Sequence, residues 1–174
     1  MKNLAFLAFP EQTELLISEL AGRFGITQKP DARYGDLLYF ENLALPEGQF
    51  PYWIRTVMLE PFFVKFNSIG EAAAELKKLQ RNWAPYQYTC FRRAQLIQEK
   101  LPYINLKERS FPVKIPNSPM GLYTLIDEHT MIASAATTST LPAGTLHFIE
   151  DHENPPSRAY LKIQESLTMA NLLN

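Results

Sequence analysis

The 174-residue sequence predicts an α+β fold, because strand-like and helix-like segments follow one another without a regular βαβ repeat. The strand-like segments are short, apolar and rich in aromatic residues. The helix-like segments have apolar residues three or four positions apart, and Pro, Gly, Asn and Asp separate the segments. Hydrophobic residues make up 46% of the chain and charged residues 20%, which is the balance of a globular protein with a core.

The chain begins with a predicted strand followed by a predicted helix. Residues 2–9, KNLAFLAF, form a short apolar run that indicates a buried strand. Pro10 and Glu11 then open a helical pattern, in which apolar residues recur at helical spacing as far as Phe24, and Gly25 stands where a left-handed helix cap is expected. The first two elements are therefore β and then α.

Two more strands are predicted before the next helix. Residues 35–41, GDLLYFE, indicate the first of them, and residues 57–66, VMLEPFFVKF, indicate the second. Pro61 lies inside the second segment and donates no backbone hydrogen bond, so it indicates an edge strand or a bulge. The order up to residue 66 is therefore β-α-β-β.

The next helix has the clearest start signal in the chain. Ser68 and Glu71 have the spacing of a capping box, and the apolar stripe behind them predicts a helix to about residue 83. Residues 86–90 predict a short strand, and residues 91–101 predict another helix. The order to residue 90 is β-α-β-β-α-β, the split βαβ pattern of ferredoxin-like sheets.

Beyond residue 105 the pattern changes to short strands with turn residues between them, which predicts a mostly antiparallel sheet packed on the preceding helix. The predicted strands are 109–115, 121–127, 130–138 and 144–150. Residues 151–157, DHENPPS, are polar and contain two prolines, so they indicate a linker. We therefore expect one region over 1–150, a linker over 151–157, and the start of a different unit over 158–174.

The net charge of −1 hides a basic middle third. Residues 55–114 carry 11 Lys and Arg against 5 Asp and Glu, whereas residues 1–54 carry 4 against 7 and residues 115–174 carry 2 against 6. A basic segment is typical of contact with nucleic-acid phosphates, although a solvated helical surface has the same composition. The candidate RNA-contacting residues are Lys77, Lys78, Arg81, Arg92, Arg93 and Lys100.

Aromatic residues accompany the second basic group. Arg92 and Arg93 follow the predicted strand that contains Tyr86 and Tyr88. Guanidinium groups near exposed rings favour phosphate contact together with base stacking. We therefore expect an RNA-binding surface there, and salt-sensitive affinity for structured RNA would follow from it.

Several other functional classes lack their signature. The seven glycines form neither a dinucleotide-binding turn nor a P-loop, and the three histidines and single Cys90 do not have metal-ligand spacing. A buried structural Cys90 is favoured over a nucleophile. One cysteine fits a reducing compartment, and with neither an export signal nor a run of about 18 apolar residues, we expect a cytoplasmic protein without a membrane anchor.

A helix start stands close to the C-terminal end of the sequence, in residues 155–166, PPSRAYLKIQES. Ser157 is placed to cap it, and apolar residues then recur on one face. A helix this short is marginal in water unless its apolar face packs on something. By spacing alone, Lys162 pairs with Glu165 as an exposed helical lysine.

The same stretch resembles the segment that opens the catalytic domain of FtsJ-like RNA ribose 2′-O-methyltransferases. The matching positions are Ser157, Arg158, Ala159, Lys162 and Glu165. Together with the β-α-β-β-α start and the basic middle, the chain resembles the N-terminal part of the bacterial large-subunit rRNA cytidine 2′-O-methyltransferase group.

This resemblance implies a ferredoxin-like and THUMP-like RNA-binding region over 1–150, followed by the first helix of a Rossmann-like methyltransferase domain. It implies S-adenosylmethionine as cofactor of the parent protein, large-subunit rRNA as partner, and Lys162 as one member of a Lys-Asp-Lys-Glu catalytic set. Cationic groups of this kind stabilise developing charge on a ribose hydroxyl. A chain without the cofactor turn is expected to be inactive alone.

Two other functions stay open at this point. One is a self-contained α+β protein-interaction module that does not bind RNA and whose last helix packs on its own body. The other is a small hydrolase that uses one of the three histidines, although spacing nominates no Ser-His-acid or Cys-His arrangement.

Overall fold

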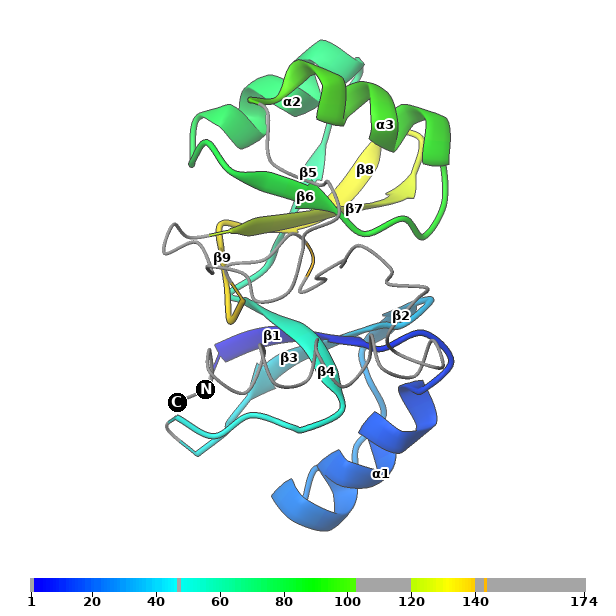
Figure 1. Ribbon diagram of the computed structural model, residues 1–174, viewed down its shortest axis with the longest axis vertical. Helices are drawn as coiled ribbons and strands as arrows, with labels where there is room; N and C mark the ends of the chain where they lie inside the picture. Colours follow the sequence, from blue (N-terminus) through cyan, green and yellow to red (C-terminus); the bar gives the residue numbers. More distant parts are fainter. Residues whose placement is uncertain (1, 47, 103–119, 140–142, 144–174) are drawn as a thin grey trace, which may run out of the picture.

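The computed structural model describes residues 2–46, 48–102, 120–139 and 143, and it confirms the α+β class. Two sheets lie face to face, with one helix outside the first sheet and two helices outside the second (Figure 1). The elements, in chain order, are β1 (Lys2–Ala8), α1 (Thr13–Phe24), β2 (Ala32–Tyr34), β3 (Leu37–Leu43), β4 (Ile54–Leu59), β5 (Phe62–Lys65), α2 (Ile69–Lys77), β6 (Trp83–Pro85), α3 (Phe91–Lys100), β7 (Gly121–Asp127), β8 (Thr130–Ser134) and β9 (Ala136–Thr137).

The strands divide between the two sheets in a fixed order. The first sheet has the order β2-β3-β1-β4-β9 and the second has the order β5-β8-β7-β6. Each described strand pair is antiparallel except β6 with β7, which is parallel. A parallel pair needs a crossover connection, and the chain between β6 and β7 contains α3.

The molecule has four layers: α1, the first sheet, the second sheet, and α2 with α3. Side chains that alternate along the strands hold these layers together. Phe6 of β1 packs in one cluster with Leu16 of α1, whereas its neighbour Leu7 packs in a cluster with Leu122 of β7. Tyr123, next to Leu122, faces the other way and packs with α2 and α3. Because successive residues of a strand point to opposite faces, each sheet contributes to two apolar layers.

Several local predictions are confirmed. The first strand and the first helix are present, although the helix begins at Thr13 rather than at Pro10, and Gly25 caps that helix with φ 68°. The backbone N–H of Glu71 donates to the Ser68 side chain, while a Glu71 carboxylate oxygen accepts from the N–H of Asn67. The predicted strand at 121–127 and the helix starting at residue 91 are also present.

The strand predicted over 57–66 is wrong, because two strands of different sheets form there. β4 ends at Leu59 in the first sheet and β5 begins at Phe62 in the second. Glu60 between them has φ 49°, a left-handed conformation that ends the first strand. Pro61 follows it, so its proline signal marks a change of sheet rather than a bulge within one strand.

The strand predicted over 130–138 divides in the same way, into β8 of the second sheet and β9 of the first. The Ser134 hydroxyl donates to the carbonyl oxygen of Leu59 over 2.6 Å. β8 pairs with β5 while β9 pairs with β4, so a two-stranded ribbon passes from one sheet to the other. This ribbon connects the two halves of the protein, which are the first sheet with α1 and the second sheet with α2 and α3.

The second predicted helix is shorter than expected. α2 ends at Lys77 rather than near residue 83, and Leu79 of its predicted apolar stripe is 52% exposed. Trp83 is buried in β6 instead, and the strand predicted over 86–90 is wrong because β6 ends at Pro85. The three-residue strand β2 was not predicted from the sequence.

These differences change the predicted topology. The strands of the β-α-β-β-α-β order do not share one sheet, because β1, β3 and β4 lie in the first sheet and β6 in the second. The second sheet packs on α2 and α3, as expected for the strands at 121–127 and 130–138. The strands predicted at 109–115 and 144–150, the linker 151–157 and the helix 158–174 lie outside the described residues.

Tyr123 provides a test of the second half of the core. Its side chain is fully buried, and its hydroxyl lies 2.9 Å from the Ala94 carbonyl oxygen and 3.2 Å from the Gln98 side-chain oxygen. We expect Tyr123→Phe to lower the free energy of unfolding at pH 7 by about 1 kcal/mol, because the hydrogen bonds to two α3 oxygens are lost. Urea denaturation followed by circular dichroism measures this change.

The same residue makes stability depend on alkaline pH. Burial raises the pKa of Tyr123 in the folded protein, so the unfolded chain loses its phenolic proton at lower pH. Stability is therefore retained below about pH 10, the ordinary tyrosine pKa, and decreases as the pH rises above it. Burial also raises the pKa of Tyr34 and Tyr86, so Tyr123→Phe should reduce the alkaline loss only in part. Identical pH profiles of both proteins would contradict this assignment.

Candidate nucleic-acid interface

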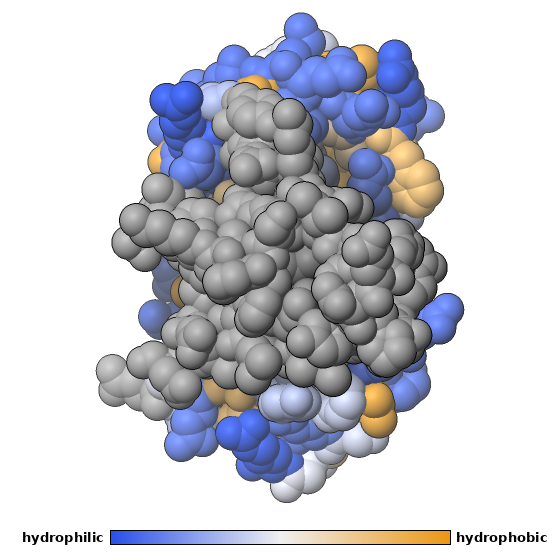
Figure 2. All heavy atoms as spheres, viewed as in Figure 1, coloured by the Kyte–Doolittle hydropathy of each residue, from blue (hydrophilic) through white to orange (hydrophobic). Residues whose placement is uncertain are grey.

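The predicted basic residues gather on the helical layer formed by α2 and α3. The inner faces of these helices pack on the second sheet through Ala72, Leu76, Ala94 and Ile97. Their outer faces carry polar and charged residues, and hydrophilic side chains cover much of this end of the molecule in Figure 2. From the start of α2 to the end of α3, residues 69–100, the sequence has six lysines and arginines and three acidic residues. This layer is therefore the basic face among the described residues.

The two helices run in the same direction, opposite to the strand β6 that connects them (Figure 1). Their N-terminal ends both lie beside the turn between β7 and β8. Arg93 in the first turn of α3 donates to the carbonyl of Glu128, and Phe66, just before α2, donates its N–H to the carbonyl of His129. The C-terminal ends of α2 and α3 therefore lie together at the opposite end of the layer.

Four of the six candidate cations lie at that C-terminal end: Lys77, Lys78, Arg81 and Lys100. All four are exposed. Lys78 pairs with Glu75 over 3.0 Å, but both side chains are exposed, so this pair contributes little stability. The side chains of the other three make no hydrogen bond or ion pair with any part of the chain that the structure describes.

Lys77 and Lys100 have a structural reason to be where they are. Each is the last residue of its helix, where a cation interacts favourably with the partial negative charge of the helix C-terminus. Arg81 follows the end of α2 and lies outside the helix. These positions alone therefore do not separate a binding surface from a solvated one.

Arg92 distinguishes a binding surface from a merely solvated one. It is exposed in the first turn of α3, where no acidic residue is present. A cation there opposes the partial positive charge of the helix N-terminus and costs roughly 0.3–1 kcal/mol. Within the described ranges Arg92 has no hydrogen-bond or ion-pair partner that offsets this cost. An exposed arginine held at a destabilising position favours a role in binding.

Arg93 differs from the other five candidates because it turns inward. Its Nε donates to the carbonyl oxygen of Glu128 over 2.9 Å, and its guanidinium carbon lies 5.9 Å from the centre of the Phe66 ring. Its Nη2 is buried without a partner among the described residues. Arg93 thus joins α3 to the turn between β7 and β8, and its guanidinium is less available to a ligand than that of Arg92.

The two tyrosines contact the first sheet. The Tyr86 hydroxyl accepts the backbone N–H of Asp36 over 2.8 Å, and the Tyr88 ring lies edge-on to the ring of Tyr34 at 5.8 Å. Gly35 has φ 65°, and a Cβ there would lie 2.6 Å from the Tyr86 hydroxyl oxygen. Tyr86 is thus held between the two halves of the protein, whereas Tyr88 keeps part of its ring exposed.

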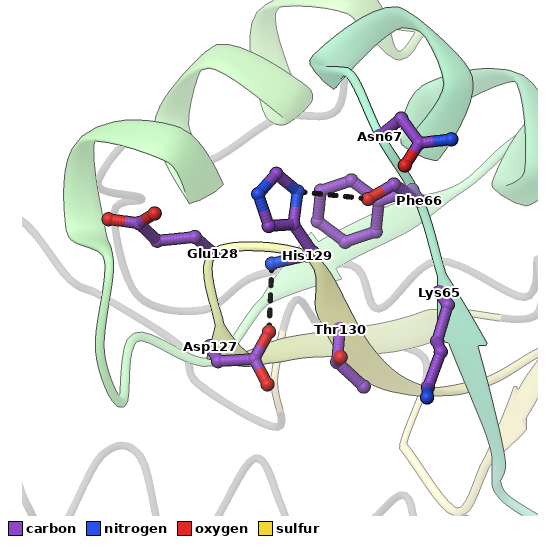
Figure 3. Close-up of a pocket in the computed structure, with 7 residues that line it drawn as sticks. All are labelled: Lys65, Phe66, Asn67, Asp127, Glu128, His129 and Thr130. Atoms are coloured by element: carbon purple, nitrogen blue, oxygen red, sulfur yellow. Dashed lines mark hydrogen bonds between the residues drawn. The ribbon is translucent and has the colours of Figure 1, made fainter.

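A pocket lies beside the N-terminal ends of the helical layer (Figure 3). The side chains of its seven lining residues carry both signs of charge. They belong to Lys65, Phe66, Asn67, Asp127, Glu128, His129 and Thr130.

Two of the pocket's polar groups are fixed by the backbone. His129 Nδ1 lies 3.1 Å from the carbonyl oxygen of Phe66, which only accepts, so Nδ1 carries a proton and Nε2 is left toward solvent. The backbone N–H of His129 donates to Asp127 and lowers the pKa of its carboxyl group. Sequence spacing does not predict this pocket, because its residues come from two distant stretches of the chain, 65–67 and 127–130.

No group of three metal-ligating side chains gathers within the described ranges, where none of the helices has the length and hydropathy to span a membrane. Lys162, the predicted catalytic residue, lies outside the described residues. No protein-family model matches this chain, and no match is found among curated proteins.

Proposed function

We propose that this chain is the RNA-binding, substrate-presenting region of an S-adenosylmethionine-dependent rRNA 2′-O-methyltransferase. The helical layer is the surface that contacts RNA. The observation that carries this proposal is the set of exposed cations without partners on that layer, and Arg92 at a destabilising position is its strongest member. Clustered lysines and arginines supply most of the affinity for a phosphate backbone.

The remaining parts of the proposal rest on the sequence resemblance alone. They are the ferredoxin-like and THUMP-like relationship of the two-sheet region, the large-subunit rRNA partner, and catalysis with Lys162 as one active-site group. In that reaction, S-adenosylmethionine supplies the methyl group. The 174-residue chain by itself is expected to transfer no methyl group, and incorporation of labelled methyl into rRNA by this chain would contradict that expectation.

The binding proposal predicts affinity for structured RNA that decreases steeply with salt. For four phosphate contacts, log Kobs should fall with log salt with a slope of roughly −3. Fluorescence anisotropy of a labelled rRNA hairpin, titrated with the chain between 50 and 300 mM salt, measures that slope. An affinity that does not change with salt, or no binding at 50 mM, would overturn the proposal.

Arg92→Glu makes the test sharper, because binding and stability should change in opposite directions. The variant is expected to weaken RNA binding several-fold and to raise the thermal midpoint by about 1–3 °C, since an acid replaces a cation at a helix N-terminus. Lys29→Glu is the matched control, an exposed lysine outside the helical layer. If Lys29→Glu weakened binding as much as Arg92→Glu, the affinity would reflect net charge rather than this surface.

The second candidate, a protein-interaction module, has one observation in its favour. β5 lies at an edge of the second sheet as described, and its Phe63 is 44% exposed. An edge strand with an exposed ring can pair with a strand of another protein. This function gains support if the chain fails to bind RNA at low salt, and Phe63→Lys should then abolish the protein contact.

A further inference from the structure

Two exposed aromatic rings lie at the start of α3, in the part of the chain that also carries Arg92. The Phe91 side chain is 59% exposed in the first turn, and Tyr88 is 39% exposed three residues before it. The other end of the layer, at the C-termini of α2 and α3, carries Lys77, Lys78, Arg81 and Lys100 and exposes Leu79 but no aromatic ring among the described residues. One end of the helical layer therefore exposes aromatic rings beside a cation, whereas the other end exposes cations without aromatic rings among the described residues.

We infer that Phe91 and Tyr88 form a base-stacking site for an unpaired nucleotide of RNA, with Arg92 contacting the neighbouring phosphate. This inference rests on the proposed RNA-binding function and deepens it. Aromatic faces next to cations are the arrangement with which proteins hold single-stranded nucleic acid, because each base offers a flat face. Charge complementarity identifies the occupant, since Arg92 at this end of the layer and Lys77, Arg81 and Lys100 at its other end are exposed cations that phosphates of one RNA can contact.

Tyr88 is prepared for this role by its packing. Its ring meets the ring of Tyr34 edge-on, at 5.8 Å between centres and 62° between planes. The contact holds the ring in one orientation while leaving part of it open. A ring that is already ordered loses little conformational freedom when a base stacks on it.

Phe91 has no corresponding role in the core. The inward residues of α3 are Ala94 and Ile97, and Phe91 is absent from the buried clusters of the described chain. Cys90 before it has φ 53°, which turns the backbone as the helix begins and precedes a side chain that lies in solvent. Stacking on a base would remove this ring from water.

The arrangement favours unpaired RNA over a continuous duplex at this end of the layer. Bases within a duplex are stacked on one another, so their faces are not accessible to Phe91 or Tyr88. Arg92 and Lys100 are separated by about 12 Å along α3, at 1.5 Å per residue. Phosphates farther along the same RNA can therefore reach the C-terminal cations while an unpaired base occupies the rings.

The test compares two RNA probes of the same length. One is a single strand with 2-aminopurine at a central position, and the other is the same strand paired with its complement. Phe91→Ala should weaken binding of the single strand by about 5- to 100-fold and reduce the quenching of 2-aminopurine, while binding of the duplex changes less than about twofold. Phe91→Trp should restore both signals, because it keeps an aromatic face.

Tyr52→Ala is the matched control, since Tyr52 is 72% exposed but lies beside α1, where Glu19 binds its backbone N–H. It should leave both affinities unchanged. If Phe91→Ala binds the single strand as well as the unmodified chain while Arg81→Glu weakens binding, the stacking site is refuted and the proposed function stands. If the unmodified chain binds neither probe at 50 mM salt, the proposed function itself fails.

Discussion

Replacing Trp83 with alanine is expected to lower the free energy of unfolding by about 3–5 kcal/mol, the usual cost of removing a fully buried large aromatic side chain. Trp83 is completely buried between the second sheet and the helical layer. Its indole Nε1–H lies 2.9 Å from the carbonyl oxygens of both Leu76 and Gln80, so it closes the C-terminal end of α2. Alanine removes both the packing and the cap.

The local geometry makes compensation difficult. A Cβ at Gly121 would lie 2.7 Å from the Trp83 ring, so the neighbouring strand β7 packs directly on the indole face. A smaller residue at position 83 therefore leaves a cavity next to the backbone of β7, which cannot move in to fill it. Urea denaturation monitored by circular dichroism measures the loss.

Two further variants separate packing from hydrogen bonding at this position. Trp83→Phe keeps most of the ring and should cost less than Trp83→Ala, with the remaining loss due to the missing indole N–H donor to the Leu76 and Gln80 carbonyls. Tyr52→Ala removes an exposed ring elsewhere and should change stability by no more than about 0.5 kcal/mol. A Trp83→Ala protein as stable as Tyr52→Ala would show that the indole does not support the core as described.

Reversing the charge of three exposed cations at one end of the helical layer is expected to reduce RNA affinity on the order of 10²–10³-fold near 0.1 M salt. The triple variant is Lys77→Glu, Arg81→Glu and Lys100→Glu. Each lost phosphate contact removes the release of about one counterion, which amounts to roughly five- to eightfold at that salt concentration. The salt slope should become shallower by about 2–3 units.

The triple variant needs a control with the same change in net charge. Lys2→Glu, Lys29→Glu and Arg33→Glu alter exposed positions outside the helical layer, and Arg33→Glu also removes an exposed ion pair with Glu14. Because Lys77 and Lys100 also stabilise their helix C-termini, the binding variant should be slightly less stable, and both proteins should be measured well below their thermal midpoints. Equal losses of affinity in the two variants would assign RNA binding to net charge and would count against the helical layer.

Local signals in the sequence predicted the elements that depend on neighbouring residues. The capping pair at Ser68 and Glu71 and the left-handed glycine at position 25 are contacts within a few residues, so their spacing is sufficient. Strand β1 is buried on both faces, so its sequence is a continuous apolar run that is easy to recognise as a strand. The basic composition of residues 55–114 predicted exposed cations, and five of the six candidate residues are exposed, but it did not show that Arg93 turns inward.

Tertiary contacts decided the features that the pattern predicted wrongly. By spacing, Trp83 continues the apolar stripe of α2. In the structure it belongs to β6, where its indole N–H donates to a carbonyl at the end of α2 and its strand pairs with β7. The break between β4 and β5 likewise depends on distant strands, because β4 pairs with β9 and β5 pairs with β8, through residues 65 to 79 positions apart in the sequence. No short window of sequence contains both partners.

The sequence by itself determined the α+β class, the positions of most helices and strands, and the concentration of positive charge on the helical layer. Only the tertiary structure decided that the strands divide into two facing sheets, that Tyr86 joins the halves, and that Phe91 stays in solvent beside Arg92. The physical reason is range. Propensity, capping and periodicity act over a few residues, whereas the choice of sheet and the exposure of a ring depend on burial against distant segments.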